Sequence, residues 1–166
     1  GRYDQRYFDT KILEEVQRAH RQNHDLFLAV LDVDNLKEIN DKYGHPAGDK
    51  LLQDVGVTIR HCIRENVDWP FRYGGDEFGV ILTQVSQDQA LMTAERFIQS
   101  FDEKKMPLTG LSIGLARFIR SKEKKWSEDI ADLVRRADIA MYKAKETGRN
   151  RVVLDQENGK HQEQEE

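Results

Sequence analysis

Hydrophobic residues recur at intervals of three and four along several stretches of the chain, a spacing that places them on one face of a helix. Phe8 and Ile12 begin the first such stretch. Gly44 and Gly148 follow two of the stretches and are typical helix ends, and Ser86 is placed to cap the start of another. The predicted helices cover residues 7–23, 35–43, 47–63, 87–101 and 127–147.

Other hydrophobic stretches are too short for helices and predict strands. Leu26 to Leu31 form an unbroken apolar run, and because such a run does not alternate, both faces of this strand are expected to be covered. Gly74-Gly75 separates two further stretches and predicts a hairpin with a two-residue turn. The predicted strands cover residues 25–33, 69–73, 77–83, 108–119 and 151–154.

The order of these elements predicts the fold class. From the first strand onward the main elements run strand, helix, strand, strand, helix, strand, which is typical of the split βαβ, or ferredoxin-like, arrangement. We therefore expect a two-layer α+β fold of βαββαβ order. Its sheet should be mostly antiparallel, with the helices packed on one face.

Composition narrows the class of protein. The 166 residues suffice for one domain, and the net charge is −4. The longest apolar run is far shorter than the about 20 residues of a membrane span, so we expect no membrane segment here. The single cysteine, Cys62, excludes an internal disulfide and fits a reducing compartment such as the cytoplasm.

The net charge belongs to the C-terminal end of the chain. Residues 155–166 hold five acidic residues and one lysine among polar neighbours, so we expect a disordered acidic tail. The domain would then be residues 1–154, which are neutral overall. A large basic surface for nucleic acid is therefore not expected.

Two pairs of acidic residues carry the candidate chemistry. Asp32 and Asp34 end the first strand and, being two apart, can share a face; Asp76 and Glu77 follow the glycine pair. We expect the hairpin and the strand end to converge. A divalent cation such as Mg²⁺ or Mn²⁺ would offset the repulsion between their carboxylates, and nucleotide chemistry would follow. Helix capping and an ordinary turn are the alternative reading of the same residues.

Five segments resemble the GGDEF family, the diguanylate cyclases. The signature itself is Arg72 to Phe78, RYGGDEF. Four further segments match in the family's order, so that the resemblance covers about residues 7–154: Asp32 to Asp41 with Gly44-His45 and Gly48-Asp49, Leu111 to Gly114, Ala137 to Lys145, and Gly148 to Asn150.

The resemblance implies a fold like the palm of polymerases and adenylyl cyclases, and the synthesis of cyclic di-GMP from two GTP with release of two pyrophosphates. By position, Asp32, the Val33 carbonyl and Asp76 would hold two Mg²⁺ or Mn²⁺ ions per GTP. Asp76 is also the family's suggested proton acceptor, with Glu77 assisting. Without catalysis, the same domain would be a silent module that binds GTP or a partner.

The resemblance also implies which residues bind GTP. Asn40 and Asp49 match the guanine-reading positions; a carboxylate at 49 can accept from guanine N1–H and N2–H₂, which adenine lacks, so GTP is favoured over ATP. The other matched contacts are His45, Arg72, Lys37 with the Leu36 and Lys37 backbone amides, Lys145 and Arg149. As plain structure, Asp49 would be a charge at a helix N-terminus, and Lys145 and Arg149 cations at a helix C-terminus.

The sequence departs from the family in two places. Where many members carry Arg-x-x-Asp for inhibition by product, this chain has Glu65 and Asp68, with Arg64 one residue early, so this site is degenerate and product inhibition is expected to be weak. The usual opening motif is also mostly missing. We expect a fragment of a longer protein with an N-terminal sensory or regulatory domain, which acts as a transient head-to-tail homodimer because one domain holds one GTP.

Overall fold

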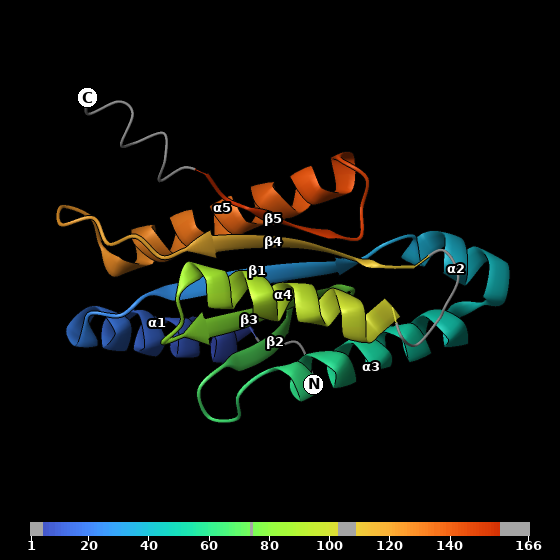
Figure 1. Ribbon diagram of the computed structural model, residues 1–166, viewed down its shortest axis with the longest axis horizontal. Coiled ribbons are helices and arrows are strands. Elements are labelled where there is room, and N and C mark those ends of the chain that lie inside the picture. The colour runs from blue at the N-terminus through green and yellow to red at the C-terminus, as the bar shows by residue number, and fades with distance from the viewer. Residues whose placement is uncertain (1–4, 74, 103–108, 157–166) are drawn as a thin grey trace.

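The computed structural model describes residues 5–73, 75–102 and 109–156, and Figure 1 shows their arrangement. The helices are α1 (Gln5–Gln22), α2 (Leu36–Tyr43), α3 (His45–Cys62), α4 (Gln87–Asp102) and α5 (Trp126–Glu146). The strands are β1 (Leu26–Val33), β2 (Trp69–Tyr73), β3 (Glu77–Thr83), β4 (Leu111–Arg117) and β5 (Arg151–Leu154). No helix among the described residues has the length and apolar character needed to span a bilayer.

The strands form one sheet in the order β2-β3-β1-β4-β5. Every neighbouring pair is antiparallel except β4 and β5, which confirms the expected α+β class with a mostly antiparallel sheet. β1 is the central strand. In its register Asp32 lies opposite Glu77 of β3 on one side and Ser112 of β4 on the other.

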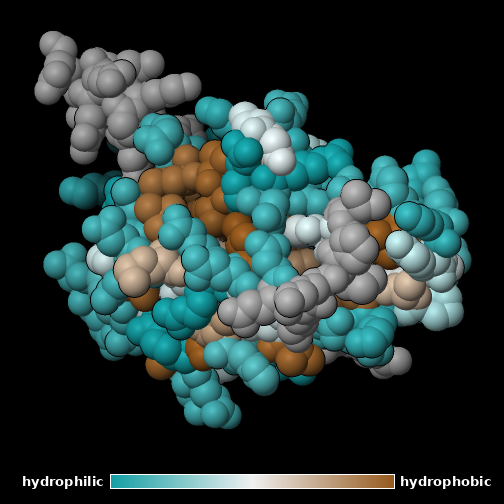
Figure 2. Space-filling model, turned by 45° about the vertical axis from the view of Figure 1, so that its right-hand side comes forward, coloured by the Kyte–Doolittle hydropathy of each residue, from teal (hydrophilic) through white to brown (hydrophobic). Residues whose placement is uncertain are grey.

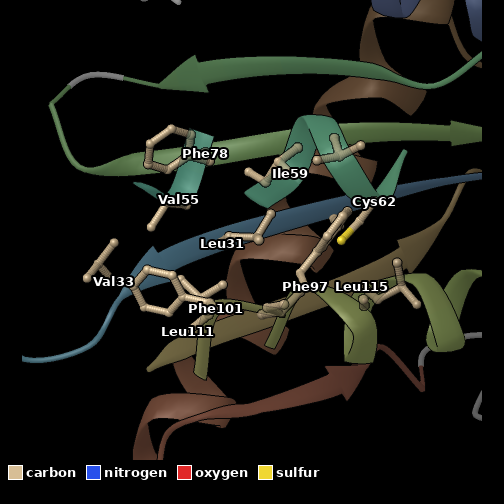
Figure 3. Close-up of a cluster of buried hydrophobic side chains, with 14 of the residues drawn as sticks. Leu31, Val33, Val55, Ile59, Cys62, Phe78, Phe97, Phe101, Leu111 and Leu115 are labelled. Atoms are coloured by element: carbon tan, nitrogen blue, oxygen red, sulfur yellow. The ribbon is translucent and has the colours of Figure 1, made fainter. Parts of the chain in front are cut away.

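Helices cover both faces of the sheet, so the expectation of helices on one face only is wrong. α3 and α4 pack on the face that carries Leu31 and Val33, where Figure 3 shows the buried cluster. α1 and α5 pack on the opposite face, against Leu28 and Val30. The βαββαβ pattern accounts for α3 and α4 alone. The apolar run of β1 needs cover on its second face too, and α1 and α5 supply it.

Close contact with the sheet fixes the position of α5. A β-carbon at Gly114 in β4 would overlap the Ala137 carbonyl and the Met141 amide of α5, so glycine lets the helix lie directly on the strand. Figure 1 shows the C-terminal end of α5 and the end of β1 at the same end of the molecule, where α2 begins. Residues far apart in the sequence therefore meet there.

The element boundaries differ slightly from the sequence prediction. Tyr73 pairs with Glu77, so three residues, not two, separate the hairpin strands; Gly74 itself is outside the described residues. Ser86 caps α4 as expected, since its Oγ accepts from Gln89 N–H at 3.1 Å. β4 is shorter than predicted and begins at Leu111.

Asp155, which was assigned to the disordered tail, belongs to the folded part. Its N–H donates to the Leu115 carbonyl at 2.8 Å, and its carboxylate accepts from Arg136 at 3.0 Å. The expectation of disorder is therefore wrong at this position. The remainder of the predicted tail, from residue 157 onward, lies outside the described residues.

Candidate functional site

Asp32 lies near the end of β1 on the face that α5 covers. Its carboxylate accepts a hydrogen bond from Lys145 Nζ in the last turn of α5. Burial raises the pKa of Asp32, and the negative charge of Asp76 raises it further, although the hydrogen bond and charge of Lys145 act in the opposite direction. Asp32 therefore has one cation partner and at least one repelling neighbour.

Glu77 adds a second carboxylate beside Asp32, because the two residues are paired in the register of β1 and β3. Burial raises the pKa of Glu77, and the charges of Asp32, Asp138 and Asp76 raise it further. Asp76 precedes Glu77 and is exposed. The hairpin and the end of β1 thus converge, as the sequence analysis expected.

Asp138 is the member of this group that the sequence analysis did not single out. It lies on α5, and partial burial raises its pKa. Asp138 and Lys145 are seven residues apart, which is about two helical turns, so they share a side of the helix. This spacing is the sequence signal from which Asp138 could have been identified. We call Asp32, Asp76, Glu77 and Asp138 the acidic cluster.

Asp34 shares the face of Asp32 but has a different environment. It is only 3% exposed. Its Oδ1 accepts from Ser112 Oγ at 2.6 Å, and its Oδ2 accepts from the Asn150 backbone N–H at 2.9 Å. Both oxygens therefore have partners within the chain, and Asp34 is a structural acid rather than a candidate ligand.

The Asn40 amide of α2 lies against Gly48 of α3, where a β-carbon on the glycine would overlap it. Asn40 Oδ1 is buried and has no hydrogen-bond partner among the described residues. On α3, His45 is the first residue and Asp49 follows four positions later, and both are exposed. A buried acceptor without a donor costs free energy, so Asn40 remains a candidate for a polar contact.

Three of the predicted phosphate-binding side chains, those of Lys145, Arg149 and Lys37, lie near the end of β1. Lys145 contacts Asp32, and Arg149 donates to Asn35 Oδ1 just before α2. Lys37 is exposed in the first turn of α2, where Leu36 begins the helix and the first backbone N–H groups have no partner within it. These groups surround the end of β1. Figure 2 turns this end of the molecule forward and shows mainly hydrophilic residues, interrupted by hydrophobic areas.

Arg72 lies apart from those cations. Its Nε donates to the Gly75 carbonyl at 3.1 Å, and its guanidinium lies 5.4 Å from the centre of the Phe78 ring. Arg72 therefore supports the turn that carries Asp76. Its predicted contact with substrate stays a prediction.

The donor set near Asp32 suits a hard divalent cation, although the described residues contain no group of three acidic, histidine or cysteine side chains arranged around one point. Two carboxylates, Asp32 and Asp76, interact electrostatically, and the Val33 carbonyl adjoins the first of them. Oxygen donors of this kind fit Mg²⁺, which retains water and shares its shell with phosphates. The residues present are consistent with the predicted metal site.

Asp68, which matches the acid of the family's product-inhibition motif, forms an ion pair with Arg64. Asp68 is 3% exposed, and both its oxygens accept from Arg64: Oδ1 from Nη2 at 2.8 Å, and Oδ2 from Nε at 3.1 Å and from the backbone N–H at 2.9 Å. Arg64 also donates to the Thr83 carbonyl at 2.5 Å. Glu65 is exposed beside this pair. The acid that matches the family's motif is thus occupied within the chain.

Comparison with solved structures finds the same fold. The active GGEEF domain of a diguanylate cyclase from Vibrio cholerae superposes with a TM-score of 0.80 at 30% identity, covering 92% of this chain and 97% of that one. The GGDEF domain of DgcB from Caulobacter crescentus, in complex with c-di-GMP, has a TM-score of 0.79 at 27% identity, covering 90% and 88%.

Sequence comparison gives the same family. Diguanylate cyclase A of Treponema denticola is 37% identical over 92% of this chain and 42% of its own length. Diguanylate cyclase DosC of Escherichia coli is 38% identical over 91% of this chain and 33% of its own. The chain therefore spans well under half the length of these relatives. Residues 2–151 match the family model described as diguanylate cyclase, GGDEF domain, and the chain belongs to that family.

Proposed function

We propose that this chain is the catalytic domain of a diguanylate cyclase, which condenses two GTP into cyclic di-GMP and two pyrophosphates. The observation that carries the proposal is the acidic cluster, in which the Asp32 carboxylate accepts a hydrogen bond from Lys145. Membership of the family and relatives named diguanylate cyclase support it.

Guanine recognition is assigned to Asn40 of α2 and Asp49 of α3. The Asn40 side chain and the exposed Asp49 carboxylate would supply acceptors for the N1–H and N2–H₂ donors of guanine, and adenine has no such pair of donors. His45, four residues before Asp49, is proposed as a further contact. GTP is therefore the proposed substrate in preference to ATP.

Triphosphate binding is assigned to the cations around the end of β1. Lys145, Arg149 and Lys37 bring positive charge toward the phosphates, and the first N–H groups of α2, at Leu36 and Lys37, point out of a helix N-terminus, which suits an anion. Arg72 is proposed to assist by holding the turn that carries Asp76.

Asp32, Asp76 and the Val33 carbonyl would hold Mg²⁺ or Mn²⁺, with two ions per GTP. When bound, such ions supply positive charge that activates the ribose 3′-hydroxyl and offsets charge on the α-phosphate. Asp76, assisted by Glu77, accepts the hydroxyl proton. The 3′-oxygen then bonds to the α-phosphorus of the other GTP, and pyrophosphate leaves. Burial and the neighbouring acids raise the pKa of Glu77, which makes it a stronger base than an exposed glutamate.

A head-to-tail homodimer is proposed to complete the reaction, because each domain has one proposed guanine site and the product needs two nucleotides. Control by a further domain is proposed as well. The relatives are longer than this chain, and among the similar structures are a coiled coil and GGDEF domain of DgcB, and SiaD from Pseudomonas aeruginosa in complex with its activator SiaC.

Incubation of concentrated protein with GTP and Mg²⁺, followed by mass spectrometry of the nucleotides, tests the proposal. Cyclic di-GMP and pyrophosphate are expected. GTP binding without product from either the domain or its full-length parent would contradict the enzyme and favour a silent binding module. Competition between GTP and ATP tests the assignment of Asp49.

A further inference from the structure

The segment that follows α5 has an unusual backbone. Gly148, Arg149 and Asn150 have φ angles of 130°, 65° and 47°, so three residues in succession lie in the left-handed region. Two of them carry a β-carbon, which makes this conformation unfavourable unless the surroundings impose it. Asn35, which Arg149 contacts through its side chain, also has a positive φ, of 59°.

The buried Asp34 carboxylate imposes this conformation from the side of β1. Asn150 donates its backbone N–H to Asp34 Oδ2 at 2.9 Å, although the two residues are 116 positions apart. Ser112 holds the other oxygen at 2.6 Å. At the helix side, the Arg149 N–H donates to the Ala144 carbonyl at 2.9 Å. The turn is therefore fixed at both ends, with the Arg149 side chain between them.

Asn150 adds a second attachment through its side chain. Its Oδ1 accepts from the Leu111 N–H at 3.3 Å, and a β-carbon at Gly110 would lie only 2.5 Å from that oxygen. The turn is thereby held against both β1 and β4. Few conformations of the Arg149 backbone remain compatible with these contacts.

We propose that Asp34 is a positioning residue for nucleotide binding, which holds the turn 148–150 so that Arg149 faces the phosphates. This inference rests on the proposed function, in which Arg149 binds the triphosphate. It assigns to the second acid of the Asp32-Val33-Asp34 segment a task different from that of the first. Asp32 faces the cation site, whereas Asp34 acts through Asn150 on the backbone of Arg149.

Alanine at position 34 tests this role, whereas asparagine does not. Asp34 receives two donors, a hydroxyl and a backbone N–H, one on each oxygen. An asparagine could keep its oxygen on the Asn150 N–H and donate its NH₂ to the Ser112 hydroxyl, because a hydroxyl also accepts. Asp34→Ala removes both acceptors and should therefore release the Asn150 N–H.

The test is a double-mutant cycle between Asp34 and Arg149. The ligand is 3′-deoxy-GTP with Mg²⁺, which lacks the attacking hydroxyl, so that binding is measured without turnover. Arg149→Ala should weaken binding about tenfold, as expected for the loss of one charged hydrogen-bond donor. Asp34→Ala should weaken it by a similar factor, and the double variant should be no weaker than Asp34→Ala within about twofold.

Asp129→Ala is the matched control. Asp129 is also a buried acid, 2% exposed, and accepts a backbone N–H from Ser121 at 2.9 Å, but it lies at the other end of α5. It should lower thermal stability as Asp34→Ala does, yet leave the affinity for 3′-deoxy-GTP within about twofold of the wild type. A purely structural role of Asp34 would make the two variants behave alike.

A second variant covers the case in which Asp34→Ala does not fold. Asn150→Ala keeps the buried carboxylate and the backbone N–H but removes the attachment to Leu111. It should also weaken binding and abolish the separate contribution of Arg149.

Two results would overturn this inference without affecting the proposed function. One is a double variant whose loss of affinity equals the product of the two single losses; the other is unchanged affinity in Asp34→Ala or in Asn150→Ala. Wild-type protein that does not bind 3′-deoxy-GTP would instead refute the proposed function together with it.

Discussion

Two sides of α5 carry acidic residues in opposite electrostatic surroundings. Asp132 and Asp138 are six residues apart on this helix, yet their pKa values move in different directions. Burial acts to raise the pKa of Asp132, but hydrogen bonds from Arg135 and Arg136 outweigh it and lower the pKa. At Asp138 burial is the cause of the shift, and the pKa is raised.

The surroundings of each acid explain the difference. On the side of Asp132, Arg136 is 1% exposed and donates to Asp132 at 2.8 Å, Asp155 at 3.0 Å and the Arg117 carbonyl at 2.8 Å. On the side of Asp138, the acidic cluster has Lys145 on Asp32 as its cation contact. Balanced charges on the Asp132 side stabilise the fold, whereas the excess of acids on the Asp138 side is, under the proposed function, the part that binds a cation.

The largest expected effect is on the acidic cluster. Asp76→Asn should reduce cyclic di-GMP formation by about a thousandfold or more, since a metal-binding carboxylate contributes several kcal/mol to the transition state. Asp76 is exposed, so the melting temperature should change little. Pyrophosphate release and thermal melting measure the two effects, and turnover within tenfold of the wild type would contradict the assignment of Asp76.

Substitutions on the Asp132 side of α5 should lower the stability of the domain rather than its activity. Arg136→Met leaves Asp155 and the Arg117 carbonyl without their donor, and breaking a buried ion pair costs about 3 kcal/mol. The melting temperature should fall by about 10 °C, with binding of 3′-deoxy-GTP unchanged.

Arg135→Met is the matched control for that variant. Arg135 contacts the same Asp132, but its side chain is 54% exposed, so the loss should be below about 1 kcal/mol. Equal losses in the two arginine variants would show that burial does not determine the contribution of these ion pairs.

The pH dependence of stability should distinguish Asp132 from Asp138, although this effect is smaller. A carboxyl with a raised pKa contributes stability below its ordinary pKa of about 4 and loses that contribution as the pH rises through its folded value. Asp138→Asn should therefore stabilise the domain at pH 7 and give little gain at pH 4. Asp132 has a lowered pKa and contributes stability above about pH 4, so Asp132→Asn should destabilise at pH 7.

Urea unfolding in EDTA at both pH values measures these differences. Both are expected to be below about 1 kcal/mol, because the acids are only partly buried and solvent screens them. Destabilisation by Asp138→Asn at pH 7 would contradict the view that its charge is unfavourable in the folded domain.

The smallest expected effect is that of added product. Asp68 is fully occupied by Arg64, and the exposed Glu65 repels a phosphodiester. Added cyclic di-GMP at micromolar concentration should change the rate of pyrophosphate release by less than about twofold, since like charges repel. Strong noncompetitive inhibition would show that a paired acid at this position still binds ligand.

Local patterns predicted much of this arrangement. Strand alternation and the glycine pair predicted that Asp32 and the hairpin acids converge, and a capping pattern predicted the start of α4 at Ser86. The patterns could not show that Asp34 bonds to Asn150, because that contact joins residues 116 positions apart. The second helical layer was missed for a related reason: the order of elements does not reveal which face a helix covers.

The distance along the chain between the proposed ligand groups affects how the protein is made. Lys145 meets Asp32 across 113 residues of sequence. A ribosome completes β1 long before it reaches α5, so a nascent or truncated chain carries the first acid without the cation beside it. Under the proposed function, production of the nucleotide messenger would start only when synthesis of the domain is finished, and incomplete chains would be silent.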